Sequence, residues 1–211
     1  MQENRNIDTN TVNYLEEFKE TIHSFSPITK ASWDLVKGIA KVRNVRKGEK
    51  LLLHGHHAKF IYYIAQGTLR AFYIDDSGNV FNKNLFLDKE ICASKVSLLR
   101  GIPSFLGIDA LENSIVISIP FNQFSAFIHE NDDLKNFYIA YIQNIWIIER
   151  EQRELSLVMQ NATERYQALL RKHPDIEHRI PLYHVASHIG ITPTQLSRIR
   201  KEIKNADLQH M

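Results

Sequence analysis

Two short helical patterns meet at a glycine near the C-terminal end of the sequence. Their apolar positions are Val185, Ala186 and Ile189 in the first pattern and Leu196, Ile199 and Ile203 in the second. Gly190 between them supplies the backbone freedom that a sharp helix C-terminus needs. Thr192 is a suitable N-cap, Pro193 suits the first helical position, and Gln195 completes a capping box. The spacing therefore predicts two helices joined by a tight turn.

The second of these helices carries a polar face that could read DNA. Its outward positions are Thr194, Gln195, Ser197, Arg198 and Lys201, with Arg200 at the margin. Small hydrogen-bonding side chains at the start of a capped helix, followed by arginine one turn later, suit the major groove. Two plainer interpretations stay open: a helical hairpin with a solvated face, and a helix-turn-helix that contacts only proteins.

Helical and strand-like patterns alternate along the rest of the chain. Residues 11–40 are predicted to be helical, with Tyr14, Leu15, Phe18 and Ile22 as one apolar stripe. Short strand-like runs follow at 51–53, 60–65, 68–74, 80–87, 107–111 and 115–119, separated by Gly and Asp/Asn turns. Such runs are typical of an antiparallel sandwich or barrel. Residues 121–129 then predict a short helix.

A long apolar helix is predicted from about Asp132 to Met159. Near-heptad spacing relates Phe137, Tyr141, Ile145, Ile148, Gln152 and Leu155, and the apolar surface is widened by Tyr138, Ile142 and Trp146. We expect one face to pack on the β domain and another to pair with the same helix of a second subunit. A purely internal core helix is the alternative. Residues 161–172 predict one further helix, capped by Asn161 or Thr163.

Composition and charge agree with a soluble protein but identify no partner. Of the 211 residues, 44% are hydrophobic and 24% charged, and the net charge is +2. No segment is long and apolar enough for a membrane span, and the polar N-terminus lacks a signal-peptide core. The single cysteine, Cys92, excludes an internal disulfide. We therefore expect a cytoplasmic protein.

The order of elements resembles the Crp/Fnr family of bacterial transcription regulators over nearly the whole chain. The resemblance rests on four stretches: the strand-entry turn at 47–49, the Tyr-x-Ile-x-x-Gly strand ending at Gly67, the hairpin turn at 75–78 and the run from Gly190 to Arg200. It implies an α+β fold with a cyclic-nucleotide-binding-like, jelly-roll β-roll and flanking helices at 1–131. A dimerisation helix at 132–159 and a helix-turn-helix domain at 160–211 would follow.

The resemblance also implies partners and residue roles. It implies a homodimer on two-fold double-stranded DNA, with RNA polymerase as a further partner and no membrane. Arg198 matches the base-reading arginine, with Thr192, Thr194, Gln195 and Ser197 beside it and Arg200 and Lys201 facing phosphates. Because Pro193 and Thr194 replace the usual Arg and Glu, we expect a different operator. The helix at 132–159 would form the interface through Phe137, Tyr138, Tyr141, Ile145 and Ile148.

The effector pocket departs from the cyclic-nucleotide-binding members of that family. Ala93-Ser94 stands where they have Gly-Glu, and no arginine occurs around Ser104 and Phe105, where the cyclic phosphate would be bound. A buried phosphate without a positive partner is costly, so we do not expect cyclic AMP. The roll would then hold another small molecule or nothing, and an unknown effector would face Glu90, Cys92, Ala93, Ser94, Ser104 and Phe105. A cyclic-nucleotide-responsive regulator with a divergent pocket stays an alternative, and we expect no cofactor.

Two metal-dependent alternatives are weaker. His54, His56 and His57 resemble the first metal motif of the cupins, which would make the chain a metal-dependent enzyme. The glutamate of that motif is replaced by Phe60 or Ile61, and no second motif follows. An iron–sulfur cluster needs several cysteines, which Cys92 alone cannot supply. We therefore expect neither a bound metal nor catalysis.

Overall fold

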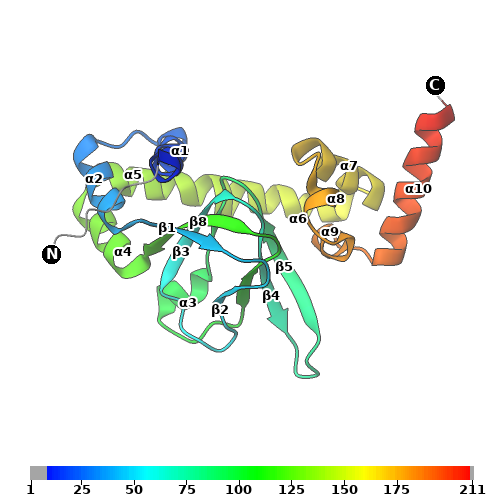
Figure 1. Ribbon diagram of the computed structural model, residues 1–211, viewed down its shortest axis with the longest axis horizontal. Coiled ribbons are helices and arrows are strands. Elements are labelled where there is room, and N and C mark those ends of the chain that lie inside the picture. The colour runs from blue at the N-terminus through cyan, green and yellow to red at the C-terminus, as the bar shows by residue number, and fades with distance from the viewer. Residues whose placement is uncertain (1–8, 210–211) are drawn as a thin grey trace.

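Two four-stranded antiparallel sheets form a β-roll at the centre of the chain, whose computed structural model describes residues 9–209 (Figure 1). The strands are β1 Lys41–Val45, β2 Lys50–Leu52, β3 Phe60–Gln66, β4 Leu69–Ile74, β5 Val80–Phe86, β6 Ile91–Cys92, β7 Gly107–Ala110 and β8 Ser114–Pro120. One sheet has the order β1-β8-β3-β6 and the other β2-β7-β4-β5. The predicted strands and fold class are confirmed. The sequence pattern missed β1 and the two-residue β6.

Strand β3 is buried on both faces, which explains its continuous apolar run. Tyr62 and Ile64 lie in the core between the two sheets. Tyr63 and Ala65, on the opposite face, belong to a second core under the helices. A strand covered on both sides needs apolar side chains at consecutive positions rather than at alternate ones. This strand therefore joins the roll to its helical cover.

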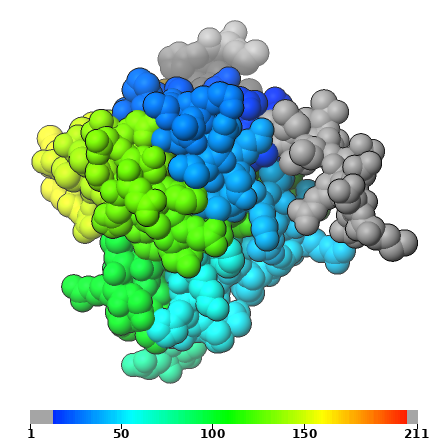
Figure 2. All heavy atoms as spheres, turned by 90° about the vertical axis from the view of Figure 1, so that its left-hand side faces the viewer, coloured from blue at the N-terminus to red at the C-terminus, as the bar shows by residue number. Residues whose placement is uncertain are grey.

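Two helices that precede the roll and two that follow it cover the outer face of the sheet that contains β3. They are α1 Thr9–Phe25, α2 Lys30–Ile39, α4 Phe121–Glu130 and α5 Asp132–Tyr141. Figure 2 shows the blue atoms of the N-terminal helices lying against the green atoms of the later ones. Phe18 and Ile22 of α1 are buried there, as the stripe predicts. Thr29 caps α2 by accepting a hydrogen bond from Ser32 N at 3.1 Å.

The long helix predicted for 132–159 is continuous but changes its winding. After α5, residues Ile142–Ile148 form a π-helical segment, η1, and α6 continues over Glu149–Met159. A π-helical turn widens the backbone spiral and shifts the register of everything that follows it. No regular heptad seam can therefore run through the helix. No described helix is both long and apolar enough to cross a membrane.

Four helices form a C-terminal unit beyond the long helix. They are α7 Ala162–Lys172, α8 Ile176–Arg179, α9 Leu182–His188 and α10 Pro193–Gln209. Asn161 caps α7 in a capping box with Glu164, as one of the two predicted alternatives. Ile176 and Val185 are fully buried and share a core with Leu85 and Leu87 of the roll. The C-terminal unit is thus docked on the roll.

Candidate nucleic-acid interface and effector site

The turn between α9 and α10 has the geometry that the sequence predicts. Gly190 adopts a φ of +75°, a conformation that other residues rarely take. The backbone amide of Gln195 donates to Thr192 Oγ1 at 3.2 Å, and the amide of Thr192 donates to Gln195 Oε1 at 2.9 Å. This reciprocal pair is a complete capping box. The predicted Leu196 and Ile199 are buried, so the opposite face of α10 is fixed outward.

The outward face of α10 is exposed and carries two cationic side chains that pair with no described carboxylate. Its exposed side chains are Thr192, Thr194, Gln195, Ser197, Arg198, Arg200 and Lys201. Among the described residues, Arg198 and Lys201 lie in no ion pair, whereas Arg200 Nε lies 2.6 Å from Glu177 Oε1. Glu177 also accepts a hydrogen bond from the hydroxyl of Tyr166. Arg200 therefore fastens α10 to α8, and its predicted phosphate contact would compete with this ion pair.

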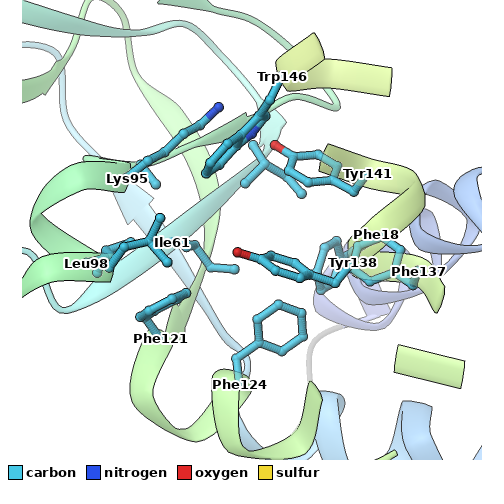
Figure 3. A pocket seen from close by; sticks show the side chains of 13 residues that line it. Phe18, Ile61, Lys95, Leu98, Phe121, Phe124, Phe137, Tyr138, Tyr141 and Trp146 are labelled. Atoms are coloured by element: carbon cyan, nitrogen blue, oxygen red, sulfur yellow. The ribbon is translucent and has the colours of Figure 1, made fainter. Parts of the chain in front are cut away.

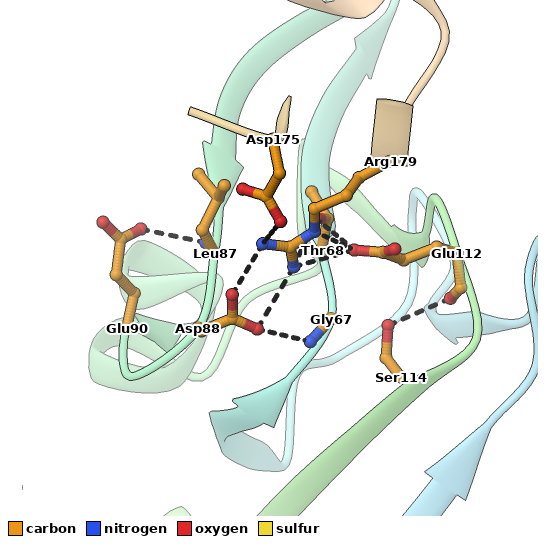
Figure 4. A network of polar contacts seen from close by, with 9 residues as sticks. All are labelled: Gly67, Thr68, Leu87, Asp88, Glu90, Glu112, Ser114, Asp175 and Arg179. Atoms are coloured by element: carbon orange, nitrogen blue, oxygen red, sulfur yellow. Dashed lines mark hydrogen bonds and ion pairs between the residues drawn. The ribbon is translucent and has the colours of Figure 1, made fainter. Parts of the chain in front are cut away.

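An arginine of the C-terminal unit, Arg179, is bound by two loops of the roll (Figure 4). Nη1 and Nη2 of Arg179 donate to the two carboxylate oxygens of Asp88 at 2.7 and 3.1 Å. Nε and Nη2 both donate to Glu112 Oε1, at 3.1 and 2.9 Å. Asp88 also accepts from the amide of Gly67 at 2.6 Å, and Glu112 accepts from Thr68 Oγ1 at 2.6 Å. The fork of Arg179 thus ties α8 to two loops of the roll.

Three further polar contacts join the roll to the C-terminal half. The amide nitrogen of Asn82 lies 2.7 Å from Nδ1 of His184, a buried residue of α9. Burial and the nearby Arg70 lower the pKa of His184 to about 4, so the neutral ring accepts this hydrogen bond. Arg153 of α6 donates to Asn84 of β5, and Lys172 Nζ lies 3.3 Å from Glu90 Oε1. Sequence reasoning missed this docking surface entirely.

Two of the predicted effector positions, Ser94 and Ser104, come together and hydrogen-bond each other. Ser94 Oγ and Ser104 Oγ are both buried and lie 2.7 Å apart. Ser104 Oγ also donates to the carbonyl of Leu106 and accepts from its amide. By the family resemblance, the ribose and phosphate ligands of cyclic-nucleotide binders would fall at or near these two positions. Here they satisfy one another and offer no charge to a phosphate.

The other predicted effector residues differ in their burial and in their contacts. Cys92 and Ala93 are buried, whereas the ring of Phe105 is 64% exposed. Burial raises the pKa of Cys92, which keeps its thiol protonated and unreactive. Glu90 accepts a hydrogen bond from the amide of Leu87 and pairs with the C-terminal unit instead of facing a ligand. Buried, exposed and ion-paired side chains are therefore mixed among the six positions.

The histidine loop holds no set of potential metal ligands. His54, His56 and His57 are all exposed between β2 and β3. His56 Nδ1 lies 3.3 Å from the carbonyl oxygen of His54, and the ring of His54 packs near Tyr73. Nowhere in residues 9–209 do three His, Cys, Asp or Glu side chains gather as metal ligands would. The cupin-like alternative thus lacks structural support.

The predicted dimer seam on the long helix faces largely inward. Phe137 and Tyr141 are buried against the N-terminal helices, with the ring of Tyr141 5.4 Å from that of Phe25. Tyr138 and Ile145 are partly buried in the same core, and of the five predicted interface residues only Ile148 is largely exposed, at 48%. The exposed apolar side chains of the helix are Ile139, Ile147, Ile148, Leu155, Leu157, Val158 and Met159. The apolar surface left for a second subunit therefore differs from the predicted seam.

Comparisons with known proteins show what the roll and the whole chain are similar to. Residues 42–131 match the family described as the cyclic nucleotide-binding domain. A Silicibacter pomeroyi DSS-3 structure, provisionally described as a cAMP-binding regulatory protein, has 19% identity and a TM-score of 0.68, with 90% of this chain and 89% of that chain covered. FixK2 from Bradyrhizobium japonicum has 15% identity and a TM-score of 0.66, with 80% and 86% covered.

A third solved structure carries the family description itself. It comes from Eubacterium rectale ATCC 33656 and is provisionally described as a transcriptional regulator of the Crp/Fnr family. It has 16% identity and a TM-score of 0.55, with 87% of this chain and 88% of that chain covered. No curated protein sequence matches this chain. Identities this low show a shared fold alone.

Proposed function

From a cyclic nucleotide-binding domain and a whole-chain fold shared with Crp/Fnr regulators, we propose that this protein is a dimeric, DNA-binding transcription regulator. The observation that carries the proposal is the outward face of α10. This face follows a capped turn, is exposed along its length and presents two cations that no described carboxylate neutralises. In Figure 1, α10 lies at the far end of the molecule from the roll, so docking leaves the helix accessible.

The side chains of α10 divide into two roles. Arg198 is the base-reading residue, because arginine can donate to both acceptors of guanine in the major groove. Thr194, Gln195 and Ser197 lie beside it and reach base edges or phosphates. Lys201 meets the phosphate backbone. Arg200 supports the helix through Glu177 and contacts DNA only if that ion pair opens.

The sensing half differs from a cyclic-nucleotide site in its chemistry. A cyclic phosphate placed near Ser94 and Ser104 would lose its hydration and gain no cation in exchange. The transfer of an unpaired anion into such a site costs several kcal/mol, roughly enough to abolish binding. We therefore propose that cyclic AMP is not the effector and that another small molecule acts on the roll.

Dimerisation is proposed on the exposed apolar surface of the long helix. Ile147 and Ile148 belong to η1, and Leu155 follows on α6, all about half exposed. Such a row of exposed aliphatic residues on one helix is typical of an interface between subunits. A two-fold pairing there would present two copies of α10 to a two-fold operator.

Selection from random duplex DNA tests the proposal, because the operator is unknown. We expect the wild-type protein to enrich an inverted repeat and Arg198→Ala to weaken binding by about 1–3 kcal/mol while relaxing preference at one base pair of each half-site. Arg171→Ala is the matched control, since it removes an exposed arginine from α7 of the same unit. Enrichment of no common sequence, or an unchanged preference in Arg198→Ala, would overturn the assignment.

A further inference from the structure

The partner of Arg200 is a carboxylate, whereas Lys95 lies against an aromatic ring. Nζ of Lys95, the first residue of α3 (Lys95–Arg100), is 4.0 Å from the centre of the Trp146 ring, beside an apolar cavity of about 50 Å³ (Figure 3). An aromatic ring attracts the ammonium but leaves its charge in place. Nε of Arg200 lies 2.6 Å from Oε1 of Glu177, and a carboxylate at this distance largely offsets the charge. The pair lies at the margin of the outward face of α10, so it lowers the positive charge that this face offers to DNA.

Glu177 receives two donors on one carboxylate oxygen. Oε1 accepts a hydrogen bond from the hydroxyl of Tyr166 and lies beside Nε of Arg200. Tyr166 is buried, and burial together with its hydrogen bond to Glu177 raises its pKa to about 12, so the phenol stays protonated and donates. The side chain of Glu177 is 21% exposed and that of Arg200 is 41% exposed. The pair is therefore partly shielded from solvent, on the side of α10 that lies against α7 and α8.

The short helix α8 fixes Glu177 in place. α8 consists of a single turn, its first residue, Ile176, is fully buried, and Arg179 at its end is bound by two carboxylates of the roll. The carboxylate of Glu177 therefore cannot follow Arg200 toward a phosphate. If Arg200 left, Glu177 would keep only the hydrogen bond from Tyr166 in a partly shielded place, whereas the phosphate contact would be made in open, salt-screened solvent. The ion pair is thus the more favourable of the two contacts.

We propose that Glu177 limits the sequence-independent part of DNA binding by holding Arg200 away from the phosphate backbone. This role rests on the proposed function, because it concerns the face of α10 that reads DNA. Each cation that meets a phosphate releases counterions, so the number of engaged cations sets how steeply binding falls with salt. With Arg200 neutralised, Arg198 and Lys201 stay available to DNA, and more of the affinity depends on contacts with the bases.

Binding to a duplex of unrelated sequence, followed by fluorescence anisotropy between about 50 and about 200 mM salt, tests this role. Glu177→Gln removes the charge but keeps an oxygen that accepts from Tyr166. It should make the slope of log affinity against log salt steeper by about 0.9, so that about 3.5-fold more affinity is lost over this range. Arg200→Gln should keep the wild-type slope, and the double variant should return to it, because Glu177 acts through Arg200.

Glu20→Gln is the matched control, because Glu20 is an exposed carboxylate of α1 and its loss changes the net charge equally. It should leave the slope unchanged, and an equal steepening there would show a general charge effect and overturn the role of Glu177. An unchanged slope in Glu177→Gln, or a shallower slope in Arg200→Gln, would also contradict it. A wild-type protein that binds no duplex would refute the proposed function and this role with it, whereas binding with unaltered slopes would refute only the role of Glu177.

Discussion

Replacing Arg179 with Met should release the C-terminal unit from the roll. The side chain of Arg179 is only 16% exposed, and its guanidinium joins Asp88 and Glu112 through four hydrogen bonds of 2.7 to 3.1 Å. Both carboxylates keep partial contact with solvent, at 37% and 24% exposure, so each bond is worth less than in a dry interior. We estimate a loss of about 2 kcal/mol of docking free energy, which is about 30-fold in the ratio of docked to undocked molecules.

Hydrogen exchange read by mass spectrometry measures this ratio segment by segment. Peptides from α8 and α9 and from strand β5 should exchange about 30-fold faster in Arg179→Met, because opening of the interface exposes both sides. The inner core around Tyr63 should keep its protection. Arg171→Met, which removes an exposed arginine without described ion pairs, is the control. Unchanged exchange in α8 and α9 would show that the apolar contacts alone hold the unit and would refute the reasoning.

Several other outcomes follow from the same contacts. Ile147→Glu should give monomers in sedimentation velocity. Leu53→Glu is the control, because Leu53 is a similarly exposed residue of the roll, and it should leave the dimer intact. Dimers that persist in Ile147→Glu would place the interface elsewhere. Thr192→Ala should lower the free energy of urea unfolding by about 1 kcal/mol through loss of the cap, and a variant as stable as the wild type would show that the cap is redundant. The pKa of His184 is about 4 in the folded protein, below the unfolded value of about 6.5. The contribution of the neutral ring to stability should therefore be complete above pH 6.5 and fall by at most about 3 kcal/mol as the pH drops to 4. In urea titrations, the free energy of unfolding of His184→Gln should depend less steeply on pH than that of the wild type.

The sequence could predict those features of the structure that depend on residues close together in the chain. The capping box of Thr192 and Gln195 and the positive φ of Gly190 depend on neighbouring residues alone, and both are confirmed. The runs that became β3 and β8 are apolar enough to require burial wherever they pair. Patterns of this kind give the elements and their order.

Long-range partners were the part that the sequence could not predict. Arg179 meets carboxylates 91 and 67 positions away, and no local pattern indicates such a pairing. The long helix is apolar on more than one face, so spacing alone cannot tell which face covers the chain's own core. That ambiguity placed Phe137 and Tyr141 at a predicted subunit interface, whereas the N-terminal helices bury both. The π-helical turn at Trp146 likewise has no signature in the sequence.

A footprint of the protein on its selected duplex tests the central claim, that two copies of α10 read double-stranded DNA. Hydroxyl-radical cleavage should show two protected segments, related by a two-fold axis and centred about 10 base pairs or a whole number of turns apart. Arg198→Ala should weaken both segments equally, because each subunit contributes one arginine. A single protected segment, or protection that stays unchanged in Arg198→Ala, would contradict the account.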